Sequence, residues 1–228
     1  MKDRPGPPRP GVSRKSRIPL ATAAGRSAAS QRWLSRQLND PYVAAAKASG
    51  FRSRSAYKLL ELNDRFHLVR QGAKVVDLGA APGGWAQAAR VAGAGKVVAI
   101  DLLPLEPIAG VDVLVADAAD PDLTERLRHL IGGSADLVLS DMAPATTGHA
   151  ATDHLRIMAL AELAFALAAG LLGPGGSFVV KLFQGGAEAS LLGDLKRRFA
   201  AVRHAKPPAS RPESRELYVV AKGFRPPG

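Results

Sequence analysis

The feature that most constrains this chain is the glycine-rich segment DLGAAPGGW at residues 77–85. It follows a short apolar run at 74–76 and leads into a segment with helical character, so we expect a strand, a tight turn and a helix in that order. In an open α/β sheet this arrangement forms a cradle for a nucleotide-type cofactor. Gly79, Gly83 and Gly84 would let the backbone turn sharply and approach a ligand closely. Three residues separate Gly79 from Gly83, so the spacing is not GxGxxG and favours a ligand without phosphates over a dinucleotide.

The composition is that of a globular protein of 228 residues with one strongly basic end. Hydrophobic residues make up 46% of the chain and charged residues 22%, which suits a single domain with a core. Residues 1–38 carry nine Lys or Arg and one Asp, and hold most of the net charge of +11. This end favours a polyanion, RNA or DNA, as the partner; the alternative is a tail that only aids solubility. The chain has no cysteine, which excludes a disulfide framework and a thiolate metal site.

The N-terminal segment differs from the rest in organisation. Residues 1–30 are rich in Pro, Gly, Ser and Arg and are predicted to be a disordered tail, which leaves 31–228 as the folded domain. The segment has no apolar core of a secretory signal, and its prolines argue against a mitochondrial presequence, so we expect a cytoplasmic protein. The longest apolar segment, 155–172, contains Arg156 and Glu162 and is predicted to be a buried core helix rather than a membrane span.

From residue 40 onward the pattern alternates between short apolar strands and helices. Asp40-Pro41 has the form of a helix start, with Asp as the N-cap and Pro in the first turn. Further helices are predicted at 53–67, 85–92, 121–131, 152–171 and 188–199, and strands at 74–78, 96–101, 111–116, 136–140, 176–181, 217–221 and, less regular in pattern, 201–205. Most of these strands are apolar on both faces. We therefore expect an α/β fold, a doubly wound, mostly parallel seven-stranded sheet with helices on both faces and the site at the strand C-termini.

Charged residues end five successive predicted strands: Asp77, Asp101, Asp117, Asp141 and Lys181. A single strand-end Asp is usually a helix cap or a loop residue, but five such positions indicate a ligand site at this edge. Asp101 is placed where an acidic side chain can accept hydrogen bonds from ribose hydroxyls. Lys181 ends an apolar strand, where an unpaired ammonium is costly. It is either paired with Asp141 for stability alone or a general base, whose neutral form burial and a second lysine would favour.

Two more charged residues are candidates on weaker grounds. Lys58 lies between apolar residues in the segment RSRSAYK (52–58), in which Arg52 and Arg54 mark a basic edge. Glu216 starts the last predicted strand beside Arg215. Taken alone, Lys58 fits a solvated helix lysine and Glu216 fits an exposed glutamate in a local ion pair.

Six motifs occur in order: SRSAYK (53–58), VVDLGAAPGGW (75–85), DLLPLEPIAGV (101–111), SDMAP (140–144), PGGSFVVKLFQG (174–185) and SRELY (214–218). Together, over about residues 31–222, they resemble the FtsJ/RrmJ-type (RlmE) family of 23S rRNA uridine 2′-O-ribose methyltransferases. The resemblance implies a Rossmann-like class I methyltransferase fold that binds S-adenosylmethionine. It also implies a catalytic tetrad at Lys58, Asp141, Lys181 and Glu216, and cofactor contacts at Gly83, Trp85, Asp101, Asp117 and Asp141.

The same resemblance implies the reaction and the partners. A ribose 2′-hydroxyl would attack the cofactor methyl in line, with Lys181 as general base. The acceptor would be the A-loop uridine of 23S rRNA within a largely assembled large ribosomal subunit. We expect no membrane partner, no metal, and a monomer. Candidate phosphate contacts are the N-terminal arginines and Arg52, Arg54, Arg65, Arg211 and Arg215.

The chain departs from the family pattern at two places. Ala145 follows SDMAP where the family usually has Asn, which bears on the support of Asp141, and the proline-rich N-terminal extension lies outside the shared pattern. Three alternatives remain open. The chain could be a 2′-O-methyltransferase of tRNA or mitochondrial rRNA. It could be a nicotinamide-dependent oxidoreductase, which the missing GxGxxG and Lys181 oppose. It could also be a non-catalytic rRNA-binding assembly factor, which the complete tetrad opposes.

Overall fold

The computed structural model describes residues 19, 27–144, 147–184 and 189–226. Apart from Pro19 and residues 27–30, the predicted tail at 1–30 lies outside the described residues. The same is true of Ala145, the position at which the chain departs from the family pattern.

Seven strands form one sheet in the order β3-β2-β1-β4-β5-β7-β6. The strands are β1 (Lys74–Leu78), β2 (Lys96–Asp101), β3 (Val111–Val115), β4 (Ala135–Ser140), β5 (Leu172–Phe183), β6 (Phe199–Ala205) and β7 (Glu216–Phe224). Pairing is parallel from β3 to β5, whereas β7 is antiparallel to both β5 and β6. The predicted α/β class and mostly parallel seven-stranded sheet are confirmed. Because the strand order reverses between β1 and β4, this is where such sheets bind ligands.

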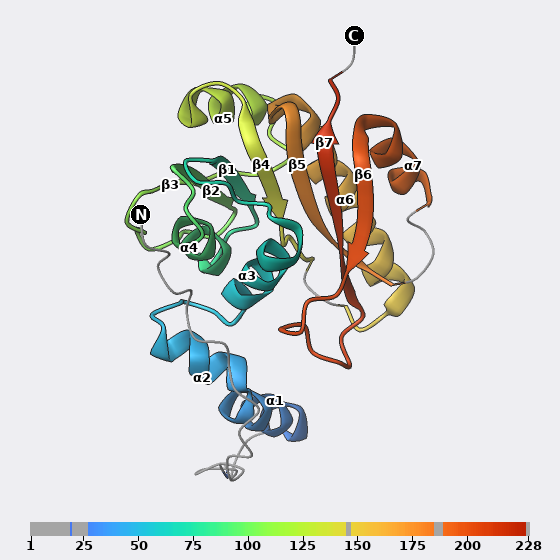
Figure 1. Cartoon of the computed structure of the whole chain (residues 1–228). Helices are drawn as coiled ribbons and strands as arrows, with labels where there is room; N and C mark the ends of the chain where they lie inside the picture. Colours follow the sequence, from blue (N-terminus) through green and yellow to red (C-terminus); the bar gives the residue numbers. More distant parts are fainter. Residues whose placement is uncertain (1–18, 20–26, 145–146, 185–188, 227–228) are drawn as a thin grey trace.

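Helices cover both faces of the sheet, and α1 and α2 extend from the body below α3 (Figure 1). The helices are α1 (Ala28–Asn39), α2 (Pro41–Ala48), α3 (Ser55–Phe66), α4 (Gly84–Val91), α5 (Leu123–Ile131), α6 (Ala150–Leu171) and α7 (Ala189–Arg198). Alternate residues of each strand enter different cores. Val75 and Val97 pack with α3 and α4, whereas Val76 and Val98 pack with α5, α6 and α7. This two-sided burial explains the apolar character of the strands.

The predicted elements are present with ends that differ by a few residues, and of the strands β5 and β7 exceed their predicted lengths most. β5 and β7 extend because they pair antiparallel from Ser177 opposite Lys222 to Phe183 opposite Glu216.

Helix α1 was not predicted, and it begins inside the segment assigned to the tail. Its residues are mostly polar and give no clear apolar stripe, but the Ser27 side chain caps it by accepting from the Ser30 backbone N–H at 3.2 Å.

The helix start at Asp40-Pro41 is confirmed. The Asp40 carboxylate accepts from the Tyr42 backbone N–H at 3.0 Å, and Pro41 occupies the first position of α2. Asp at the N-cap satisfies a helix N–H that would otherwise lack a partner, and Pro has no N–H to satisfy there.

Helix α6 contains the apolar segment at 155–172 and, by length and composition alone, could cross a membrane. In the structure it covers β4 and β5. Its buried apolar residues are Ile157, Met158, Ala161, Ala164, Leu167, Ala168 and Leu171, and most of them join the core with α5 and α7. Arg156 and Glu162 lie on its other sides, so the prediction of a core helix is confirmed.

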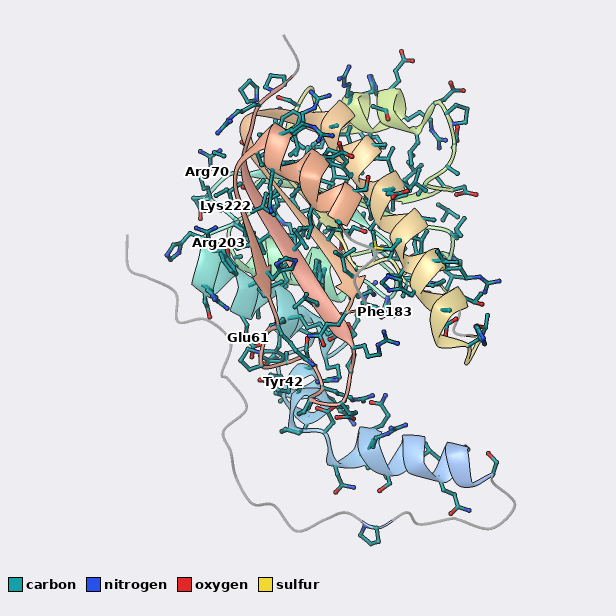
Figure 2. The ribbon with its side chains drawn as sticks, turned by 90° about the vertical axis from the view of Figure 1, so that its right-hand side faces the viewer. Tyr42, Glu61, Arg70, Phe183, Arg203 and Lys222 are labelled. Atoms are coloured by element: carbon teal, nitrogen blue, oxygen red, sulfur yellow. The ribbon has the colours of Figure 1, made fainter. Side chains whose placement is uncertain are left out.

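Glu61 on α3 fastens both α2 and the β6–β7 connection to the domain. Its carboxylate accepts from the Tyr42 hydroxyl at 2.8 Å and from the Ala209 backbone N–H at 2.7 Å. Figure 2 shows Tyr42 just below Glu61. Because Ala209 is fully buried, its N–H cannot bond to water instead.

We therefore predict that Glu61→Ala lowers the free energy of unfolding by about 1–3 kcal/mol, because it leaves a buried donor unpaired. Urea denaturation would measure the loss. Glu162→Ala is the matched control, since Glu162 is an exposed glutamate within a helix, and its effect should stay within about 0.5 kcal/mol. Equal effects of the two substitutions would contradict this account of Glu61.

Candidate active site

The glycine-rich turn joins β1 to α4 and requires glycine at two positions. Gly79 has a φ of +74°, and a Cβ there would lie 2.6 Å from Cγ and 2.9 Å from Cα of Met142. Gly83, the N-cap of α4, has a φ of +108°, and its Cβ would lie 2.5 Å from Cδ1 of Ile108. Only glycine combines this backbone conformation with so close an approach. The sharp turn that the sequence predicted is therefore present, and the close approach of its glycines to a ligand stays a prediction.

A cleft of about 630 Å³ opens at the C-terminal ends of β1 to β4, against α6. We call it the strand-end cleft. Gly79 and Ala81 of the glycine-rich turn line it, together with Asp101, Asp117 and Asp141. The Asp101 carboxylate accepts from the backbone N–H groups of Ala81 at 2.8 Å and Leu103 at 2.9 Å, and thereby ties the turn to the segment after β2.

Three of the five predicted cofactor contacts therefore line the strand-end cleft, whereas Gly83 and Trp85 do not. Trp85 is buried at 2% exposure, and its ring packs against the ring of Tyr218 with centroids 5.5 Å apart. Its large apolar ring belongs to the core that also contains residues of α3 and α4, and it does not line the cleft. Gly83 is covered by Ile108 and Arg52.

The four residues of the predicted tetrad, contributed by α3, β5, β7 and the end of β4, lie together at one edge of the sheet. Nζ of Lys181 lies 2.9 Å from Oδ1 of Asp141 and donates to the Asp141 backbone carbonyl at 2.5 Å. Nζ of Lys58 donates to Oε2 of Glu216 at 2.8 Å. Tyr218 joins the two pairs. Its hydroxyl accepts from Lys58 at 3.2 Å and donates to Oδ1 of Asp141 at 2.8 Å.

This cluster sets the charge states of Asp141 and Tyr218. Burial acts to raise the pKa of Asp141, but the positive charges of Lys181 and Lys58 and the hydrogen bonds from Lys181 and Tyr218 outweigh it and lower that pKa below its ordinary value of 3.8. Burial and the nearby negative charges of Asp141 and Glu216 raise the pKa of Tyr218 well above 10.0. Asp141 is therefore an anion at neutral pH, and Tyr218 keeps its proton.

A second cleft, of about 380 Å³, opens on the other side of the cluster. We call it the arginine cleft. It is lined by Arg36, Gln37, Arg54, Ser55, Lys58, Arg211, Glu213, Ser214 and Glu216. A further hollow of about 380 Å³ beside α1 and α2 shares Arg36, Arg54, Arg211 and Glu213 with it, so the two adjoin. Asp141 thus lines one cleft, and Lys58 and Glu216 line the other.

Asp40 holds two arginines in the arginine cleft. Nε of Arg54 lies 3.1 Å from Oδ2 of Asp40, and Nη2 of Arg211 lies 3.4 Å from the same oxygen. Arg54 also donates to the Ala209 backbone carbonyl. One carboxylate opposite two guanidinium groups leaves a net positive charge there.

Arg52, Arg65 and Arg215, which were also predicted as phosphate contacts, do not line the arginine cleft, and the arginines before residue 27 lie outside the described residues. Arg65 is exposed and stacks on the ring of Phe66 at 5.0 Å, and Arg215 donates to the Gln184 backbone carbonyl at 2.6 Å. The Arg52 guanidinium donates to the carbonyls of Glu106 at 2.7 Å, Pro107 at 2.8 Å and Pro82 at 3.3 Å. Arg52 therefore joins the glycine-rich turn to the segment between β2 and β3, a role that its place in a basic run did not indicate.

Asp77, the last residue but one of β1, is fully buried, and neither carboxyl oxygen makes a hydrogen bond of ordinary geometry within the described part of the chain. Burial raises its pKa well above 3.8, the negative charges of Asp141 and Asp101 add to this effect, and the backbone amide of Ala86 opposes it. Unlike the other strand-end acids, Asp77 does not line the strand-end cleft.

Tyr218 was not predicted as a site residue. The signal was available in SRELY, because Glu216 and Tyr218 are two positions apart on a strand and share a face. The strand direction that brings this face to the site could not be read from the motif.

The strand order, the single reversed strand, the glycine-rich turn and the acidic strand-end cleft define a Rossmann-like class I methyltransferase. A model of FtsJ-like methyltransferases matches residues 51–224, and the chain belongs to this family. It is 63% identical to "Ribosomal RNA large subunit methyltransferase E" of Granulibacter bethesdensis, over 92% of each chain. It is 60% identical to the protein of the same name from Acidiphilium cryptum, over 95% of this chain and 96% of that one.

A solved structure described as a ribosomal RNA methyltransferase of Plasmodium falciparum is also similar. It superposes with a TM-score of 0.68 at 28% identity and covers 76% of this chain and 98% of its own. The cofactor of this methyltransferase type is S-adenosylmethionine. The strand-end cleft fits that group, since Gly79 offers a wall without a side chain and Asp101 offers carboxylate oxygens to ribose hydroxyls.

The buried carboxyl of Asp77 leads to a prediction about pH. In the unfolded chain Asp77 ionises near 3.8, but in the folded protein its raised pKa retains the proton to higher pH. Between these two values the stability of the wild-type protein falls by about 1.4 kcal/mol per pH unit. Asn carries no such proton, so Asp77→Asn should gain stability relative to the wild type as the pH rises from about 4 to 7. Denaturation at several pH values would measure the difference, and a difference independent of pH would refute the prediction.

Proposed function

We propose that this protein transfers a methyl group from S-adenosylmethionine to the ribose 2′-hydroxyl of the A-loop uridine of 23S rRNA, within the assembled large ribosomal subunit. The observation that carries the proposal is the placement of Lys58, Asp141, Lys181 and Glu216 between the strand-end cleft and the arginine cleft. A cofactor in the first cleft and an RNA strand in the second would meet at these side chains.

Lys181 is the general base. When bound, S-adenosylmethionine supplies a methyl group on a positively charged sulfur, already activated toward a nucleophile. A neutral lysine amine has two hydrogens and one lone pair. The two acceptors that Asp141 presents, Oδ1 at 2.9 Å and the backbone carbonyl at 2.5 Å, match the two hydrogens. The lone pair is then left to take the proton of the 2′-hydroxyl.

Lys58 and Glu216 act from the side of the acceptor. Nζ of Lys58 donates two of its three hydrogens, one to Glu216 and one to Tyr218. The third is available to the ribose oxygen, because Lys58 lines the arginine cleft. The positive charge of Lys58 also favours loss of the proton from Lys181. Glu216 holds Lys58 in this orientation.

Much of the rate is expected from positioning. The methyl donor needs no further activation, so the protein mainly has to hold two reactants in line. Orientation of this kind contributes about 7–11 kcal/mol in favourable cases. The cluster is suited to this role because its side chains are buried or half-buried and are linked to one another by hydrogen bonds.

The arginine cleft supports RNA as the acceptor. Arg36, Arg54 and Arg211 line it next to Lys58, and guanidinium groups suit the phosphates of a nucleic acid strand. The names of the similar proteins point to large-subunit ribosomal RNA in particular. The basic N-terminal segment adds further positive charge that would attract the same RNA. We place the reaction in the cytoplasm.

Methyl transfer to three acceptors tests the proposal: undermethylated large subunits, free 23S rRNA and bulk tRNA, each with labelled S-adenosylmethionine. We expect label on the large subunit, mapped by nuclease digestion to a 2′-O-methyl in the A-loop, and less on free 23S rRNA. Subunits that already carry the methyl group are the control and should take up none. Label on tRNA would keep the chemistry and overturn the acceptor. No transfer despite tight cofactor binding would support a non-catalytic rRNA-binding assembly factor.

A further inference from the structure

Tyr218 joins the two ion pairs of the tetrad, because its hydroxyl contacts Lys58 of one pair and Asp141 of the other. It lies on β7, directly opposite Lys181 of β5 in the antiparallel register, and is fully buried. The ring of Trp85, which follows the glycine-rich turn, packs on one side of it with centroids 5.5 Å apart. Nζ of Lys58 lies over the same ring, 5.7 Å from its centroid. The ring thus contacts one residue of α4 and one residue of α3.

The direction of the two hydrogen bonds of the Tyr218 hydroxyl follows from chemistry. A lysine ammonium can only donate, so the hydroxyl accepts from Lys58 at 3.2 Å. A phenol has one hydrogen, and it goes to Oδ1 of Asp141 at 2.8 Å. That oxygen is also the one that contacts Nζ of Lys181 at 2.9 Å. The chain Lys58, Tyr218, Asp141, Lys181 is therefore continuous, and Asp141 accepts from Tyr218 on one side and from Lys181 on the other.

No ion pair within 4 Å joins Lys58 directly to Asp141 in the described part of the chain. The hydrogen-bonded link between the two halves of the cluster there is the phenol. A hydrogen bond to an ionised group has a larger effect than one between neutral groups. Its removal would leave Asp141 with more of its negative charge directed at Lys181.

We propose that Tyr218 is a positioning residue of the methyl transfer, whose hydroxyl couples Lys58 to the Asp141–Lys181 pair and sets how readily Lys181 gives up its proton. This inference rests on the proposed function, since it assigns Lys181 as the base. The hydroxyl weakens the hold of Asp141 on the Lys181 proton by donating to the shared oxygen. Tyr218 lines neither cleft, so its effect passes through its neighbours.

The test is single-turnover methyl transfer by the wild type and by Tyr218→Phe, measured across pH with saturating S-adenosylmethionine on undermethylated large subunits. Phe keeps the ring that packs on Trp85 and removes only the hydroxyl. We expect cofactor affinity within about twofold of the wild type and a rate at neutral pH lower by roughly tenfold or more. The acidic limb of the pH–rate profile should move to higher pH, because Asp141 then holds the Lys181 proton more strongly.

Tyr57→Phe is the matched control. Tyr57 is also buried, at 2% exposure, and its hydroxyl pairs with Ser49 at 3.1 Å outside the cluster. This variant also removes the hydroxyl of a buried tyrosine, so it reports the loss of stability from such a change, and it should keep the wild-type pH profile. If Tyr218→Phe does not fold, 3-fluorotyrosine at position 218 replaces it. A fluorinated phenol donates more strongly, and the acidic limb should then move to lower pH.

The outcomes separate the two proposals. Transfer by the wild type with an unchanged pH profile in Tyr218→Phe, or a loss of rate that only follows the loss of stability seen with Tyr57→Phe, would overturn the role of the hydroxyl and leave the proposed function in place. No transfer by the wild type to any acceptor would overturn the proposed function itself.

Discussion

The contact between Lys181 and Asp141 is the interaction on which the rest of the site depends. β4 and β5 are parallel neighbours, paired through Ser140 opposite Val180. Asp141 follows Ser140 and Lys181 follows Val180, so these two residues lie side by side at the edge of the sheet. Both are largely shielded from water, so each charge needs the other, and loss of one partner of such a pair typically costs about 3–5 kcal/mol. A parallel register thus produces a buried ion pair at the place where ligands enter.

The reversed strand β7 completes the cluster and separates the two clefts. It runs against β5, so Tyr218 lies opposite Lys181 and Glu216 lies opposite Phe183, near the same edge. Figure 2 shows Phe183 at the lower end of the sheet, on the side from which α1 and α2 extend. Glu216 then holds Lys58 of α3. One cluster can serve both clefts because Asp141 lines the strand-end cleft, whereas Lys58 and Glu216 line the arginine cleft.

Much of this arrangement could be predicted from the sequence, for reasons that differ between elements. Strands such as 74–78 and 96–101 were predicted with their observed bounds, because burial on both faces leaves a continuous apolar run between turn residues. The strand-end position of Asp101, Asp117 and Asp141 followed from the same pattern. By contrast, the roles of Tyr218 and Arg52 depend on partners far away in the chain. The three carbonyls that Arg52 binds belong to Pro82, Glu106 and Pro107, and no local pattern marks them.

The most direct test of this account replaces Lys181 by Met, which keeps an apolar stem in the core but removes the amine. Single-turnover transfer to undermethylated large subunits would be measured beside the affinity for S-adenosylmethionine. If Lys181 is the general base at the junction of the two clefts, the rate should fall by at least about a hundredfold while cofactor affinity stays within a few fold. A rate near that of the wild type would contradict the account, because the cluster would then not take part in the transfer.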